Sequence, residues 1–209
     1  MRRTIVGLGV ILLAAGCGET ETDLLGGQGL AQGGCHATND LPLLHWAPGS
    51  RCLRVTYDPA LAEHAEALAK ALETWSALEC SGLCFQAPVE ADLDLDVDHP
   101  GYMHFAARPS DLGQAISSQL VFELDTREIF YAVTFVDEEL LSAIHPELLQ
   151  AAWTGAVGDA LALITPPRGE RSVLASWEDD LAPEPTDLDV QRFCNLYGEG
   201  GVCEIRPAP

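Results

Sequence analysis

The chain has 209 residues, which suits a single domain that follows a short leader. It carries 11 lysine and arginine residues against 32 aspartate and glutamate residues, a formal net charge of −21. Such a surface repels nucleic acid and anionic lipid headgroups, so we exclude nucleic-acid binding and leave open either simple solubility or a cationic partner.

The first 16 residues have the order of a signal peptide. A basic pair precedes an almost wholly apolar run over residues 4–13, and the small residues 14–16 precede Cys17. The apolar run is shorter than the roughly 20 residues that span a bilayer. The residues before Cys17 resemble the lipobox of bacterial lipoproteins. We therefore expect cleavage before Cys17 and a lipid anchor on it; a signal peptide cut elsewhere is the alternative.

The glycine-rich segment 17–34 is typical of a flexible tether, so the folded domain is expected over residues 35–209. The residue after Cys17 is Gly18 and not the Asp that marks inner-membrane retention in some bacteria. We therefore expect a lipid-anchored protein of the bacterial cell envelope, at the outer membrane. The partners expected are the membrane, through the lipid on Cys17, and a peptide or protein.

The other six cysteines form an even set, which indicates disulfides in an exported chain. Sequence cannot choose among the possible pairings. The prediction adopted here joins neighbours along the chain: Cys35–Cys52, Cys80–Cys84 and Cys194–Cys203. A zinc site at the C-x3-C spacing of Cys80 and Cys84 is the alternative, but no second cysteine pair of that kind accompanies it.

In the first half of the chain, residues 51–57 predict a strand, and Asp58 is placed to cap a helix that begins at Pro59. Apolar side chains at helical spacing extend this helix to Leu78. Residues 92–98 alternate aspartate with apolar residues, which predicts a strand with one acidic face. A calcium loop is the alternative, but its required glycine and glutamate are missing.

In the second half, runs 119–124 and 129–136 flank a polar break and predict a hairpin. Residues 146–163 predict a buried helix that Pro166 ends, and Thr186 with Asp189 predicts a capping box at the start of a third helix. The expected fold class is α+β, with a twisted mixed sheet, a long N-terminal helix, a buried second helix and a C-terminal helix.

The buried helix contains Gly155 and Gly158, each of which costs about 1 kcal/mol against alanine. Segment 153–165 resembles the zinc helix of metzincin proteases, H-E-x-x-H-x-x-G-x-x-H, and is most similar to the matrixin branch. Residues 171–176 resemble the Met-turn of that family, with Leu174 where methionine stands. Residues 185–198 are similar to its closing helix. The resemblance covers residues 46–198 and implies a metzincin-like domain.

Position by position, the resemblance places Gly155, Asp159 and Thr165 where the three zinc-binding histidines stand, and Ala156 where the catalytic glutamate stands. Ala162 takes the place of the glycine that turns the chain after the helix. None of these residues is a zinc ligand of the required kind, although Asp159 alone could contact a cation. The resemblance thus implies no zinc, no cofactor and no catalytic residue; a buried apolar helix with accidental spacing is the alternative.

The function expected is that of a catalytically inactive protease-like domain that binds a peptide or protein by strand addition. The strand over residues 129–136 and the cleft beside Asp159 are the expected site. A zinc endopeptidase with a relocated metal site and a structural envelope protein are the alternatives. His99 and His104 flank a Pro-Gly turn and could meet in space, although a lone exposed histidine is the favoured interpretation of each.

Overall fold

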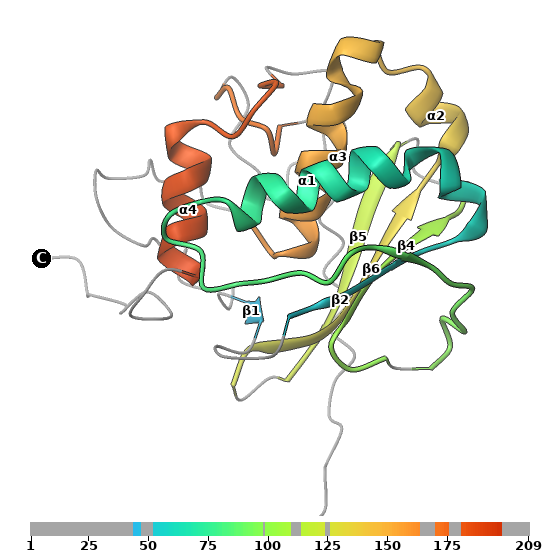
Figure 1. Cartoon of the computed structure of the whole chain (residues 1–209), viewed down its shortest axis with the longest axis horizontal. Helices are drawn as coiled ribbons and strands as arrows, with labels where there is room; N and C mark the ends of the chain where they lie inside the picture. Colours follow the sequence, from blue (N-terminus) through green and yellow to red (C-terminus); the bar gives the residue numbers. More distant parts are fainter. Residues whose placement is uncertain are drawn as a thin grey trace, which may run out of the picture.

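The computed structural model describes residues 44–46, 52–97, 99–109, 114–123, 126–163, 170–175 and 181–197 (Figure 1). The signal peptide, Cys17, the tether, Cys35, Thr165 and Cys203 lie outside these ranges. Within them, no helix is long and apolar enough to cross a membrane.

One mixed sheet contains all the strands of the described ranges. The strands are β1 (His45–Trp46), β2 (Arg54–Tyr57), β3 (Val89–Glu90), β4 (Tyr102–Ala107), β5 (Ile116–Phe122) and β6 (Glu128–Val136). Along the order β1-β6-β4-β2-β3 every pair is parallel, whereas β5 pairs with β6 antiparallel. The predicted mixed sheet and the predicted hairpin are therefore confirmed, with β5 beginning three residues earlier than expected.

Helices cover one face of this sheet (Figure 1). They are the 3-10 helix η1 (Pro59–His64), followed by α1 (Ala65–Ser76), α2 (Glu138–Ser142), α3 (Pro146–Ala160) and α4 (Asp187–Tyr197). α1 packs on α3, and α3 packs on β5 and β6. α3 is buried on most sides, as its apolar composition predicts, and residues 153–158 are all buried.

The predicted strand over residues 92–98 is wrong. Those of its residues that the structure describes, 92–97, form coil and a turn after the short edge strand β3. The Asp94 carboxylate accepts the Asp96 N–H at 3.0 Å, and the Asp94 carbonyl accepts the Val97 N–H at 3.2 Å. Aspartate side chains that bond to the nearby backbone compete in this way with strand pairing.

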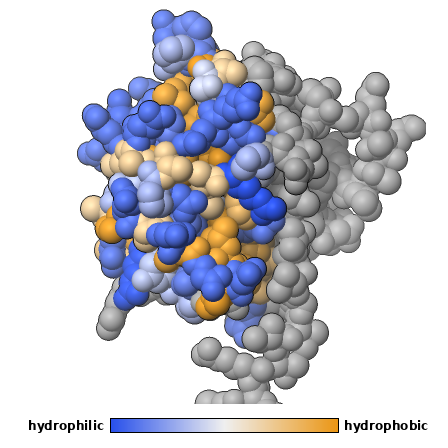
Figure 2. Space-filling model, turned by 90° about the vertical axis from the view of Figure 1, so that its right-hand side faces the viewer, coloured by the Kyte–Doolittle hydropathy of each residue, from blue (hydrophilic) through white to orange (hydrophobic). Residues whose placement is uncertain are grey.

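The apolar positions of this loop also find no core. Leu95 is 41% exposed and Val97 is 51% exposed. Figure 2 looks onto the side of the molecule that carries the loop, where small apolar areas lie between hydrophilic ones. Alternation of aspartate with apolar residues is therefore not enough to make a strand when nothing packs on its apolar side.

The three predicted disulfide pairings are also wrong. The structure joins Cys52 to Cys84 and Cys80 to Cys194, with Cα–Cα distances of 4.5 and 5.4 Å. These bonds exclude Cys35–Cys52, Cys80–Cys84 and Cys194–Cys203 as predicted, although Cys35 and Cys203 themselves lie outside the described residues.

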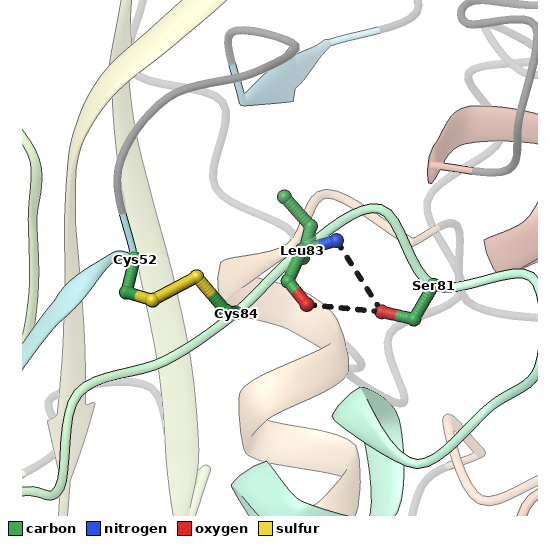
Figure 3. Close-up of a disulfide and its surroundings, with 4 residues drawn as sticks. All are labelled: Cys52, Ser81, Leu83 and Cys84. Carbon is green, nitrogen blue, oxygen red and sulfur yellow. Dashed lines mark hydrogen bonds between the residues drawn. A yellow bond between two sulfur atoms is a disulfide. The ribbon is translucent and has the colours of Figure 1, made fainter.

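The physical reason is the position of loop 80–84, which lies between two elements that are distant in sequence. On one side, the Leu53 N–H donates to the Cys84 carbonyl at 2.8 Å. On the other, the Gly82 N–H donates to the Tyr197 carbonyl at 2.8 Å. Between Cys80 and Cys84, Ser81 Oγ accepts the Leu83 N–H at 3.4 Å. Figure 3 shows this turn beside the Cys52–Cys84 disulfide. Cys84 therefore meets Cys52, just before β2, and Cys80 meets Cys194 of α4, so neither pairs with the other.

Candidate functional site

The two glycines of α3 let the turn at residues 172–175 approach the helix closely. A Cβ atom added at Gly155 would lie 2.5 Å from the Val173 carbonyl oxygen, and one added at Gly158 would meet the Leu174 side chain. Gly155 is thus required by packing against backbone, which offsets its low helix propensity, whereas Gly158 faces the end of a side chain that can rotate. The structure brings Leu174, which the resemblance aligns with the Met-turn methionine, directly against the helix that the resemblance aligns with the zinc helix.

Asp189 holds this turn in place from α4. Its carboxylate, which is fully buried, accepts the Ser172 hydroxyl at 2.5 Å and the Val173 N–H at 3.1 Å. The Ser172 Oγ in turn accepts the Leu174 N–H at 2.9 Å. The carbonyl of Val173 therefore lies on backbone that is fixed by buried hydrogen bonds, and it cannot easily move away from Gly155.

The predicted capping box is confirmed and does more than begin α4. The Thr186 N–H donates to Asp189 Oδ2 at 2.9 Å, and the Asp189 N–H donates to Thr186 Oγ1 at 3.3 Å. Sequence reasoning found this local pair but missed the second role of Asp189 in holding the turn. Only the tertiary contact with Ser172 reveals that role.

The C-terminal end of α3 turns back on itself through a left-handed residue. Ala162 has φ +60°. The Leu163 N–H donates to the Gly158 carbonyl at 3.0 Å, and the Ala162 N–H donates to the Asp159 carbonyl at 2.9 Å. These two bonds form a Schellman motif, which usually has glycine at the left-handed position. The backbone turn is thus kept at the position where the family resemblance places a glycine, although the residue is alanine.

Replacing Ala162 with glycine is expected to stabilise the protein by about 0.5–1 kcal/mol. The left-handed conformation costs an L-residue roughly 1–2 kcal/mol, which glycine avoids. The greater conformational freedom of glycine in the unfolded chain cancels part of this stabilisation. Urea unfolding measures the difference. Ala152→Gly in the same helix is the control, expected to lose about 1 kcal/mol; equal losses in both variants would contradict this account.

Asp159 is the only acidic residue in the last two turns of α3. Its Oδ1 is enclosed and has no hydrogen-bond partner within the described ranges, although part of the residue stays accessible. Burial raises the pKa of this carboxyl to about 7. Its position near the helix C-terminus is unfavourable as well, because the partial negative charge there repels a carboxylate.

The residues that the resemblance aligns with the zinc ligands and the general base therefore have distinct environments. Gly155 faces a backbone carbonyl that leaves no room for a side chain, Ala156 is buried at 1% exposure, and Asp159 carries an unpaired carboxyl oxygen. Thr165 lies outside the described residues, so its distance from the others is not defined. Among the residues that the structure describes, no group of three or more His, Cys, Asp or Glu could hold a metal ion.

His99 and His104 do not form a hydrogen-bonded pair but have separate partners. The His99 ring lies against Tyr102 and Tyr131, with centroid distances of 5.9 and 5.5 Å. His104 is fully buried, and its Nδ1 lies 2.9 Å from Thr56 Oγ1. The expectation of a lone exposed histidine is therefore wrong for His104, which is buried, and the His99 ring lies near enough to contribute to lowering the pKa of His104.

His104 also bonds Asp58, and this corrects the expected role of that aspartate. Asp58 makes no side-chain capping bond to the helix that follows it. Its Oδ1 lies 3.1 Å from His104 Nε2, and its Oδ2 accepts the Ala107 N–H at 2.8 Å. Burial lowers the pKa of His104, and the nearby Asp58 carboxylate counters part of that shift. The fully enclosed ring cannot contact a substrate, so this chain of polar groups ties β2 to β4.

Comparison with models of protein families and with curated proteins finds no match for this chain.

Proposed function

We propose that this chain is a metzincin-like domain that no longer hydrolyses peptides and instead binds an extended peptide segment. The observation that carries the proposal is the contact between Gly155 and the Val173 carbonyl. A zinc-binding imidazole at this position would collide with backbone that Asp189 holds in place. Ala156, at the position of the catalytic base, has no proton-accepting group.

Three features support the family assignment. The turn with Leu174 packs on the helix with Gly158, Ala162 keeps the left-handed turn that the family makes with glycine, and α4 closes the domain. The order of strand, helix, further strands, buried helix and closing helix is the one expected from the resemblance. Together these features join residues far apart in the sequence.

The expected peptide-binding strand needs a correction. β6, which contains residues 129–136, lies inside the sheet between β4 and β5, so its backbone groups are already used. Within the described strands, β5 pairs only with β6 and has its other edge open. We therefore propose that the peptide pairs with β5 and not with β6.

The backbone pattern of β5 defines what it offers a peptide. The Asp137 N–H donates to the Ala115 carbonyl at 2.9 Å, so the backbone groups of Ala115 point toward β6. Because antiparallel strands alternate in this respect, the N–H and C=O groups of Ile116, Ser118 and Leu120 point toward the open edge. An extended peptide pairs with these groups, and the acidic chain favours a peptide with positive charges.

Hydrogen exchange and metal analysis test the proposal together. A pool of basic hexapeptides is expected to slow amide exchange in residues 116–122. Ile116→Pro removes one outward N–H at a strand edge, where proline is tolerated, and is expected to weaken this protection; Ile116→Val is the matched control.

The purified domain is expected to contain no stoichiometric zinc. Chelator-sensitive digestion of casein would overturn the proposal in favour of a relocated metal site.

We also propose that lipid on Cys17 anchors the domain to the bacterial cell envelope, at the outer membrane. Two disulfides within the described residues fit an oxidising compartment. Cys17→Ser is expected to move the protein from the membrane fraction to the soluble fraction, as immunoblotting after fractionation measures. Membrane retention of the variant would contradict the anchor.

A further inference from the structure

The large apolar side chains that are exposed among the described residues all lie in one short stretch, 89–97. They are Val89 of the edge strand β3, 60% exposed, and Leu95 and Val97 of the loop that follows it, 41% and 51% exposed. Apolar residues scattered over a surface are common, whereas apolar residues that gather at one place mark an interaction site. Figure 1 shows this loop, in green, projecting from the edge of the sheet.

The outer side of segment 89–97 is open and strongly acidic. Among the described strands β3 pairs only with β2, so its other edge has no neighbour there. The segment contains no basic residue, and four exposed acidic side chains alternate with its apolar ones: Glu90, Asp92, Asp94 and Asp96. The exposed apolar surface is therefore interleaved with negative charge.

The turn within this segment is held by its own hydrogen bonds. The Asp94 carboxylate accepts the Asp96 N–H at 3.0 Å, and the Asp94 carbonyl accepts the Val97 N–H at 3.2 Å. The Asp94 carbonyl also lies 2.9 Å from His99 Nε2, and the His99 ring packs against two tyrosine rings. Because the Asp96 and Val97 N–H groups are already bonded, a partner cannot pair with this turn as a strand. Recognition therefore depends on the side chains.

The charge of the segment selects its partner. A second copy of this chain would bring the same four carboxylates to the contact, and anionic lipid headgroups would be repelled as well. A cationic partner is attracted by the same charges. A helix with one apolar stripe and basic side chains beside the stripe presents both kinds of contact at once.

We propose that segment 89–97 binds a basic amphipathic helix of a partner protein. The apolar stripe of that helix covers Leu95 and Val97, and its lysine or arginine side chains lie beside Asp92 and Asp96. This surface is separate from the peptide site proposed on β5, because β6, β4 and β2 lie between the two edges of the sheet. The inference therefore does not depend on the proposed function.

The test uses the purified full chain and a labelled peptide of about 18 residues, with leucine at helical spacing and lysine elsewhere. Fluorescence anisotropy in about 0.15 M salt measures its affinity. Leu95→Ser together with Val97→Ser is expected to weaken binding about tenfold, because less apolar surface leaves water. Asp92→Asn together with Asp96→Asn is expected to weaken binding about fivefold, a difference that disappears in about 1 M salt.

Glu73→Gln together with Glu79→Gln is the matched control for charge. Both residues are exposed and lie outside segment 89–97, so this variant loses the same two charges and is expected to bind within about twofold of the wild type. The same peptide with glutamate in place of lysine is expected not to bind. An equal loss of affinity in this control and in Asp92→Asn with Asp96→Asn would show attraction by net charge alone and would overturn the inference.

Hydrogen exchange locates the bound peptide. The lysine peptide is expected to slow amide exchange in segment 89–97 of the wild-type chain. Unchanged affinity in the folded Leu95→Ser, Val97→Ser variant, as circular dichroism verifies its fold, would overturn the inference. Slower exchange confined to residues 116–122 would overturn it as well and would leave the proposed function standing.

Discussion

Replacing Cys80 and Cys194 together with alanine is expected to lower the free energy of unfolding by roughly 4–5 kcal/mol. The disulfide joins residues 114 positions apart, so its loss frees a long loop in the unfolded chain. It also releases loop 80–84 from α4, where the Gly82 N–H donates to the Tyr197 carbonyl at 2.8 Å. Chemical denaturation of the purified domain measures the change.

The second disulfide is the matched control for this prediction. Cys52 and Cys84 are 32 positions apart, so their joint replacement with alanine is expected to cost roughly 3–4 kcal/mol. Cys84 is exposed, so little core packing is lost with it. If the variant lacking Cys52–Cys84 were clearly the less stable of the two, loop length would not be the dominant effect.

Gly155→Ala is expected to destabilise the protein by about 2 kcal/mol, although alanine is the better helix former. The new Cβ atom would lie 2.5 Å from the Val173 carbonyl oxygen, and overpacking of this kind costs up to roughly 3 kcal/mol. The higher helix propensity of alanine offsets about 1 kcal/mol of this cost. Urea unfolding at pH 7, followed by circular dichroism, measures the balance.

Gly158→Ala is the control that separates packing from helix propensity. The new Cβ atom would meet the end of the Leu174 side chain, which can rotate, and would lie 3.2 Å from the Trp75 ring. The same gain in propensity then nearly balances the cost, so this variant is expected within about 1 kcal/mol of the wild type. Equal losses at both glycines would show that the Val173 carbonyl moves as easily as the Leu174 side chain.

Local patterns in the sequence were sufficient for the helices and for the capping box at Thr186. The apolar spacing from Leu61 to Trp75 predicts the first helix, and its residues are buried as expected, although the helix begins with the 3-10 turns of η1. The hairpin was predicted because two strand-like runs flank a polar break. These features depend on residues only a few positions apart.

Prediction of the candidate site was less complete. The sequence singled out Gly155, Asp159 and Leu174, and the structure places Leu174 against the helix that carries the other two. It could not show that Asp189 holds the turn or that Asp58 bonds His104, since each contact joins segments that meet only in the folded chain. The aspartate-rich run over residues 92–97 failed as a strand because it has no packing partner.

By itself, the amino-acid sequence determined the mixed α and β content, the strongly acidic charge, and the lack of imidazoles along the segment that resembles a zinc helix. Only the tertiary structure decided the disulfide partners, the strand whose edge is open among the described strands, and the enclosure of Asp159 Oδ1 without a partner among the described residues. The reason is physical. Charge, helical periodicity and capping act over a few residues, whereas pairing and burial depend on which distant segments the folded chain brings together.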